Sequence, residues 1–179
     1  MRLTTERLTI APLAAEEAAA FATYRQRPEI ALYQSWEASY SVENALDLVE
    51  GQSGWLLPPA GEWMQLGVHR ENELIGDVAI HLLDDQPDSW ELGITFAVQG
   101  QGYATEALAA VVEHLFDRHQ AHRVIAFCDA RNASVHALLE RVGLRQESRQ
   151  VEADWFKGEW TTLDGFALLA SEWKHLRNS

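Results

Sequence analysis

The sequence is poor in cysteine, in basic residues and in long apolar runs. Cys128 is the only cysteine among 179 residues, so an internal disulfide is excluded and nothing indicates an oxidising compartment. No apolar run has the length of a transmembrane helix, and the N-terminus lacks the apolar stretch of a signal peptide. We therefore expect no membrane partner, and the cytoplasm is the default location.

Positive charge is scarce in this chain. There are 14 Lys and Arg residues against 27 Asp and Glu residues, which gives a net charge of −13. Nucleic-acid binding usually requires a basic surface, so we expect no nucleic-acid partner. The acidity first of all indicates a solvated, self-repelling surface, and it also favours a cationic substrate such as an amine.

The length fits one domain, 1–179, and the stretch from Trp90 to Leu115 is its most informative part. Residues 90–98 are rich in β-branched and aromatic side chains, as is typical of a strand. Gly100 and Gly102 allow a turn with positive φ, and apolar residues recur at helical spacing from Ala104 onward. The stretch therefore predicts a strand, a glycine turn and a helix N-terminus that binds an anion, most simply a phosphate.

The flanking pattern places this stretch in a larger sheet. Residues 63–69, 74–83 and 90–98 favour an antiparallel meander. The other expected elements are a strand at 8–12, helices at 15–25, 41–50, 104–118 and 132–141, and strands at 123–128, 144–152 and 161–169. This order predicts an α/β (α+β) fold with a mixed, mostly antiparallel central sheet flanked by helices.

Three families use a phosphate turn of this kind. A P-loop would end in Gly-Lys-Ser/Thr, where this chain has Tyr103-Ala104. A dinucleotide-binding oxidoreductase keeps the Gly100 and Gly102 spacing, but Thr105 takes the third glycine position, so this alternative is less favoured. The pattern Gln99-x-x-Gly102-x-Ala104 instead resembles the acetyl-CoA pyrophosphate loop of the GNAT acyltransferases.

Further motifs extend the resemblance over almost the whole chain. They are Thr4-Thr5-Glu6-Arg7-Leu8, Glu91-Leu92-Gly93, Gly102-Tyr-Ala-Thr-Glu106, Asn132-Ala-Ser134 and Gly143-Leu144. In this order they are similar to the RimJ/RimL branch, which acetylates amines. The resemblance implies acetyl-CoA as the acetyl donor and a GNAT-like fold, in which the strands at 90–98 and 123–128 splay apart to admit the pantetheine arm.

The resemblance also implies where the donor binds. The residues that it assigns to acetyl-CoA are Phe96, Ala97, Val98, Gln99, Gly100, Gln101, Gly102, Tyr103, Ala104, Asn132 and Ser134. Main-chain N–H groups of 99–104 would hold the pyrophosphate. Asn132 and Ser134 also stand where a helix is expected to begin, so N-capping is their structural alternative.

Acetylation of an amine benefits from a base, because most amines are protonated at neutral pH. Glu91 is the first candidate, since it begins the central strand near the expected splay, and Asp154 is the second. Many family members have a tyrosine as the acid, but Leu139 occupies that position here, which leaves Ser134 or water to protonate the leaving thiolate.

The acceptor is expected to be a primary amine, either a protein N-terminus or a small molecule, attacked directly in a ternary complex. Aromatic residues in segments that flank the acceptor cleft of this fold are Tyr33, Trp36, Tyr40 and Trp155, and we expect them to contact the substrate. A CoA-binding protein without turnover is the alternative from another class. A homodimer is compatible with exposed aromatics, and the histidine spacing does not favour a metal.

Overall fold

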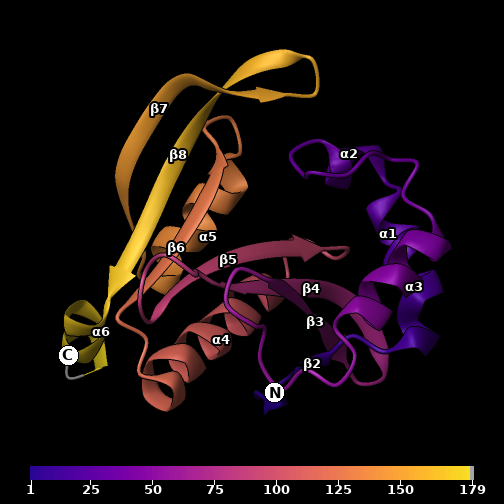
Figure 1. The fold of residues 1–179 in the computed structure, drawn as a ribbon, viewed down its shortest axis with the longest axis horizontal. Coiled ribbons are helices and arrows are strands. Elements are labelled where there is room, and N and C mark those ends of the chain that lie inside the picture. Colours follow the sequence, from indigo (N-terminus) through magenta and orange to yellow (C-terminus); the bar gives the residue numbers. More distant parts are fainter. Residues whose placement is uncertain (178–179) are drawn as a thin grey trace.

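The computed structural model describes residues 1–177, so residues 178 and 179 of the predicted domain lie outside it. In the described chain, eight strands form one sheet in the order β1-β2-β3-β4-β5-β6-β8-β7 (Figure 1). Their bounds are β1 Leu3–Thr4, β2 Thr9–Pro12, β3 Trp63–Arg70, β4 Glu73–Leu82, β5 Ser89–Phe96, β6 Arg123–Asp129, β7 Arg145–Phe156 and β8 Glu159–Leu169. The helical segments are η1 Ala15–Glu17, α1 Ala18–Arg25, α2 Pro28–Ala31, α3 Val42–Gly51, α4 Tyr103–His119, α5 Ala133–Val142 and α6 Ala170–Arg177. No helix in this range is long and apolar enough to cross a membrane.

The sheet confirms the predicted mixed fold. Every neighbouring pair is antiparallel except β5 and β6, which are parallel. Only three residue pairs join these two strands, and the last of them is Glu91 with Ile125. Beyond Glu91, residues 92–96 of β5 have no partner in β6, so the expected splay is present.

Helix α4 supplies most of the core on one face of the sheet. Leu108, Val111, Val112 and Leu115 are fully buried there, as their helical spacing predicts. Val124 and other alternate residues of the central strands pack against them. Truncation of one such leucine to alanine would lower the free energy of unfolding by about 2–5 kcal/mol. This packing holds α4 and its N-terminus firmly against β5.

A second cluster, built by α1 and α3, is fixed to the sheet by a buried ion pair. Asp77 of β4 accepts hydrogen bonds from Tyr24 Oη at 2.6 Å and from Arg25 Nη2 at 3.1 Å. Burial raises the pKa of Asp77, although Arg25 and Tyr24 oppose the shift. The Arg25 guanidinium lies between the rings of Phe21 and Trp36, 3.9 and 3.7 Å from their centroids. This cation–π contact orients the helical block over β4.

The C-terminal strands differ most from the expectation. The strands expected at 144–152 and 161–169 are longer, and they form a hairpin whose second strand, β8, inserts between β6 and β7. The hairpin turns at Lys157 and Gly158, both with positive φ. In Figure 1 it arches away from the sheet toward α2.

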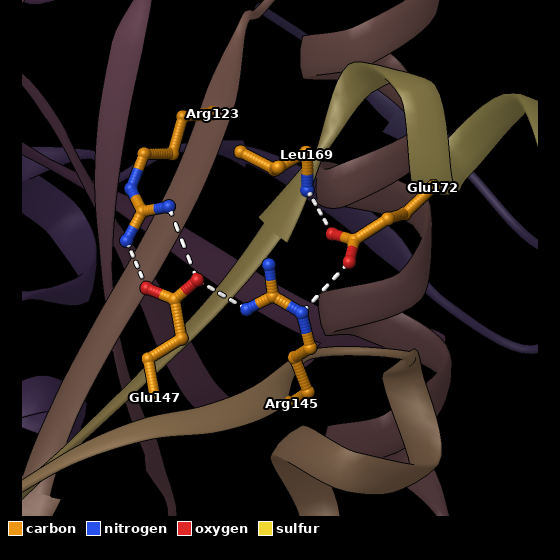
Figure 2. A network of polar contacts seen from close by, with 5 residues as sticks. All are labelled: Arg123, Arg145, Glu147, Leu169 and Glu172. Carbon is orange, nitrogen blue, oxygen red and sulfur yellow. Dashed lines mark hydrogen bonds and ion pairs between the residues drawn. The ribbon is translucent and has the colours of Figure 1, made fainter.

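An ionic network fixes the base of this hairpin (Figure 2). Glu147 of β7 pairs with Arg123 of β6 and with Arg145, and Arg145 Nε donates to Glu172 of α6 at 2.7 Å. Glu172 also accepts from the Leu169 backbone N–H at 2.8 Å. Hydrogen bonding by Arg123, supported by Arg145, lowers the pKa of Glu147. The base of the hairpin is thus held, while its tip extends toward α2.

Candidate functional site

The glycine turn after β5 has the predicted conformation. Gly100 has φ +75° and Gly102 has φ +78°, and Gly102 is the N-cap residue of α4. Among the residues that the structure describes, no side chain caps the start of this helix. Its first N–H groups therefore remain available to an anion, and the helix dipole adds to the attraction.

A cavity of about 460 Å³ opens at this helix start. It is lined by every residue from Val98 to Thr105, by Phe96 and by Ser134 and Arg141 of α5. All residues predicted to hold acetyl-CoA line it except Ala97 and Asn132. Ala97 lies in the β5 end of the loop, where its N–H is bonded to the Ile75 carbonyl at 2.9 Å.

A smaller cavity of about 80 Å³ continues between the diverging strands. Leu92 and Gly93 of β5 and Cys128 of β6 line it, as does Asn132, and it shares Ile94 and Val135 with the first cavity. Five strand residues, 92–96, separate the loop from the point where pairing begins. At a rise of about 3.4 Å per residue, the route is roughly 17 Å deep, which suits an elongated arm.

Four arginines surround the loop in this acidic protein. Arg7 Nη1 donates to the Gln101 carbonyl at 3.1 Å, and Arg27 Nη1 donates to the Ala97 carbonyl at 3.0 Å. Arg141 Nη1 donates to Thr105 Oγ1 at 3.2 Å, and the Arg70 guanidinium lies 5.7 Å from the Tyr103 ring centroid. Sequence reasoning missed this set, because its members come from four separate segments. Their convergence favours a ligand with several negative charges.

Arg7 also anchors the first turn of α4. Glu106 accepts from Thr5 Oγ1 at 2.5 Å, from the Arg7 N–H at 2.9 Å and from Arg7 Nε at 2.6 Å. Burial alone would raise the pKa of Glu106, but the hydrogen bonds from Thr5 and Arg7 together lower it. The opening motif and the glycine loop, about one hundred residues apart in the chain, thus form one structural unit.

The structure separates the two predicted bases. Glu91 lies at the point where β5 and β6 diverge, and its Oε2 is 3.4 Å from His81 Nδ1. Asp154 lies near the end of β7, where it pairs with Thr161 of β8. Strands β6 and β8 stand between β5 and β7, so the two carboxylates are distinct candidates and do not form a pair.

Asn132 and Ser134 are engaged with each other at the start of α5. Asn132 Oδ1 accepts from the Val135 N–H at 3.3 Å and from Ser134 Oγ at 2.8 Å. The predicted N-cap role of Asn132 is therefore confirmed. Each residue also lines one of the two adjoining cavities, so capping does not remove either from the predicted donor site.

The four aromatic residues predicted for the acceptor are placed differently. Tyr33 lines the cavity between the diverging strands. Trp36 and Tyr40 face the buried Arg25 guanidinium, with ring centroids at 3.7 and 5.2 Å from its Cζ. Trp155 is 61 % exposed on the hairpin and packs edge-on against Trp160. Two of the four thus hold an internal cation.

A lysine links the β7–β8 hairpin to the α2 region. Lys157, at the hairpin tip, donates to the backbone carbonyls of Ala31 and Trp36, each at 2.7 Å. Glu37 lies 3.7 Å from the same ammonium group. The hairpin is thereby linked to the end of α2 and to the segment after it, a contact that no local sequence pattern indicates.

Other reactive groups do not form a second centre. Burial raises the pKa of the Cys128 thiol to about 12, so it stays protonated near neutrality. No three His, Cys, Asp or Glu side chains gather as a metal site in residues 1–177. A wider depression of about 960 Å³ is lined by the C-terminal half of α4, including Asp117 and Arg118. The glycine turn and the helix start do not belong to it.

Comparison with known proteins identifies the family. A model described as "Acetyltransferase (GNAT) domain" matches residues 7–145. The chain belongs to the GNAT acetyltransferase family. A curated relative, the uncharacterized N-acetyltransferase YnaD of Bacillus subtilis (strain 168), is 26 % identical over 175 residues, which cover 97 % of this chain and 99 % of YnaD.

Solved GNAT structures share the fold. A putative ribosomal-protein-serine acetyltransferase from Vibrio cholerae is 26 % identical, with a TM-score of 0.78 over 94 % of this chain and 97 % of that one. The spermidine N-acetyltransferase from Vibrio cholerae, solved with CoA and spermine, is 19 % identical, with a TM-score of 0.81 over 95 % and 99 %. As a GNAT acetyltransferase, the protein is an acyltransferase that uses acetyl-CoA.

The residues present fit this donor. A diphosphate requires several N–H donors and positive charge, which the uncapped start of α4 and the surrounding arginines provide. A thin apolar arm requires a slot between strands, and the unpaired part of β5 with the cavity beside it provides one. A side chain at Gly102 would need the strained positive φ of +78°, which explains the glycine.

Proposed function

We propose that this protein is an N-acetyltransferase of the RimJ/RimL branch that acetylates a primary amine by direct attack within a ternary complex. One observation carries the proposal: strand pairing between β5 and β6 stops at Glu91, and a lined route leads from there to the glycine loop. A donor held along that route and an acceptor that arrives at Glu91 would meet at the same point.

Backbone N–H groups and two arginines have separate roles in donor binding. The N–H groups of residues 99–104 receive the diphosphate, while Arg7 holds the Gln101 carbonyl and keeps the loop in shape. Arg141 of α5 donates to Thr105 Oγ1 in the first turn of α4 and lines the same cavity. Acetyl-CoA supplies an acetyl thioester when bound, and the unpaired edge of β5 offers backbone hydrogen-bonding groups along its arm.

Glu91 is favoured over Asp154 as the carboxylate that assists deprotonation. It stands where the route between the strands ends, whereas Asp154 lies on the outer strand of the hairpin. Ser134 is proposed as the group that protonates or solvates the leaving thiolate, since it lines the donor cavity. Its hydroxyl is held by Asn132, so the cap of α5 would set the orientation of the acid.

The acceptor is proposed to be a cationic amine, either a protein N-terminus or a small polyamine-like molecule. The net charge of −13 favours cations over anions as approaching ligands. Of the four aromatic residues expected to contact the substrate, Tyr33 lines the cavity between the diverging strands, so it is the first choice for contact with the acceptor. The Lys157 link closes one side of the entrance, which favours slender acceptors.

Initial-velocity measurements test this function. The protein is incubated with acetyl-CoA and a panel of N-terminal peptides, polyamines and neutral amino compounds, and free CoA thiol is monitored. We expect turnover with a cationic amine, intersecting double-reciprocal lines and no acetylated enzyme by mass spectrometry. Tight CoA binding without acetylation of any amine would instead favour a binding protein without turnover.

A further inference from the structure

A histidine stands directly beside Glu91 at the point where the strands diverge. His81 of β4 pairs with Glu91 of β5, and Trp63 of β3 pairs with His81. The Trp63 and His81 rings are stacked, with centroids 4.8 Å apart. Because directly paired residues project from the same face of a sheet, the indole, the imidazole and the carboxylate form one row. The row ends at the last position at which β5 is paired to β6.

The contacts leave one nitrogen of this imidazole available. His81 Nδ1 lies 3.4 Å from Glu91 Oε2, and within residues 1–177 Nε2 makes no hydrogen bond. The side chains of His81 and Glu91 are 16 % and 24 % exposed, so both are sheltered but accessible. A carboxylate at Nδ1 favours the tautomer that carries its proton there, which leaves the lone pair on Nε2. Stacking on Trp63 restricts rotation of the ring.

We propose that His81 accepts the proton of the acceptor ammonium group and that Glu91 is the residue that positions it. This inference rests on the proposed function. An N–H bond of the ammonium breaks, its proton passes to Nε2, and the nitrogen keeps the electron pair. The neutral amine then attacks the thioester carbonyl carbon, and the C–S bond breaks with its electron pair on sulfur. The thiolate takes a proton from the Ser134 hydroxyl, which is restored by the second proton from nitrogen, and the imidazolium releases the first proton to solvent.

An imidazole suits this step better than a carboxylate does. Ordinary imidazoles titrate near pH 6.5 and carboxylates near pH 4, while amines titrate at about 8 to 10.4. The free-energy cost of proton transfer falls as the pKa of the base approaches that of the ammonium group, so a base with a pKa closer to neutrality removes the proton at a lower cost. Glu91 is the charged group in contact with the ring, and the Trp63 indole covers one of its faces.

The test compares variants of the full chain with an amine that the wild-type protein acetylates. In His81→Gln we expect kcat at neutral pH to fall by about 100-fold or more, with the Kd of acetyl-CoA unchanged by calorimetry. The loss should shrink as the pH rises, because more of the free amine is then neutral. Glu91→Gln should lose less, and added imidazole should restore part of the activity of His81→Ala.

His69→Gln is the matched control. His69 also lies on β3 in contact with a carboxylate, that of Glu17, but it is paired with β2 and not with β5. We expect its kcat to stay within about twofold of the wild-type value, because the His69 ring contacts Glu17 and the Thr9 carbonyl and not Glu91.

Four results are decisive. A kcat within twofold of wild type in His81→Gln overturns the inference, and so does a larger loss in Glu91→Gln, since the carboxylate would then be the base itself. If circular dichroism shows His81→Gln to be unfolded, imidazole rescue of His81→Ala decides, and absence of rescue counts against His81. A wild-type protein that binds acetyl-CoA but acetylates no amine refutes the proposed function instead.

Discussion

Glu106 links the N-terminal segment to the start of α4, and the loss of this link should lower stability by an amount that the structure allows us to estimate. Replacement of Glu106 by alanine removes three hydrogen bonds, those from Thr5 Oγ1, the Arg7 N–H and Arg7 Nε. Each bond contributes about 1 kcal/mol net to stability, so we expect the free energy of unfolding to fall by about 2–3 kcal/mol. The Arg7 side chain is 43 % exposed, so its ionic attraction adds little to this sum. For a chain of this size we expect Tm to fall by about 4–12 °C.

Differential scanning calorimetry of four proteins tests this reasoning: the wild type, Glu106→Ala, Arg7→Ala and the double variant. Arg7→Ala removes the Nε bond to Glu106 but keeps the backbone N–H bond, so the losses in unfolding free energy should overlap by about 1 kcal/mol in a double-mutant cycle. Glu113→Ala is the control, since Glu113 lies on the same helix, is 54 % exposed and, among residues 1–177, has only a 3.6 Å ion pair with Arg177. Additive losses, or a Tm for Glu106→Ala equal to that of the control, would refute the proposed anchor.

The Arg7–Glu106 pair should also affect donor binding, and Gly102, Lys157 and Asp164 give further predictions. Arg7→Ala should weaken acetyl-CoA about tenfold in calorimetry, since its bond to Gln101 is lost, whereas an unchanged Kd would exclude this role. Gly102→Val should weaken it by at least as much, because φ +78° costs a branched residue about 1–3 kcal/mol. Lys157→Ala should raise the KM of the amine several-fold but leave the Kd of acetyl-CoA unchanged, and an unaltered KM would show that the link does not shape the entrance. Hydrogen bonding by Arg149 lowers the pKa of Asp164, so this stabilisation is present above the ordinary Asp pKa and is lost as the pH falls through the lower folded value. Below about pH 4 the Tm of wild type should therefore fall more steeply than that of Asp164→Asn, and parallel curves would contradict this.

The donor half of the site could be predicted because its signals are local. Gly100 and Gly102 have the positive φ that only glycine adopts freely, and the helical spacing after them gives the buried face of α4. The limited pairing of β5 and β6 could be predicted only through the resemblance to a known fold. Periodicity identifies strands, but it does not show where two of them separate.

The acceptor half could not be predicted in the same way. The contacts of Lys157 with Ala31 at the end of α2 and with Trp36 join residues more than one hundred positions apart. The sequence predicts Trp36 and Tyr40 as substrate contacts, and in the structure both rings lie against the buried Arg25 guanidinium. The elements expected from the sequence do not include the short helix α2, which begins at Pro28, a residue well suited to the first position of a helix.

His81 shows a further limit of sequence reasoning. It is ten residues from Glu91 in the chain, and no motif links the two. Their contact follows from the register of β4 against β5, which is fixed by strand pairing along the whole hairpin. A shift of one residue would turn His81 to the other face of the sheet. Side chains selected by register become visible only in three dimensions.

A crystal structure of the protein grown with acetyl-CoA tests the central claim most directly. We predict that the diphosphate lies within hydrogen-bonding distance of the N–H groups between Gly100 and Ala104, and that the thioester lies beside Glu91 where β5 and β6 separate. Density for the donor at another surface, with side chains closing the space between these strands, would contradict the account.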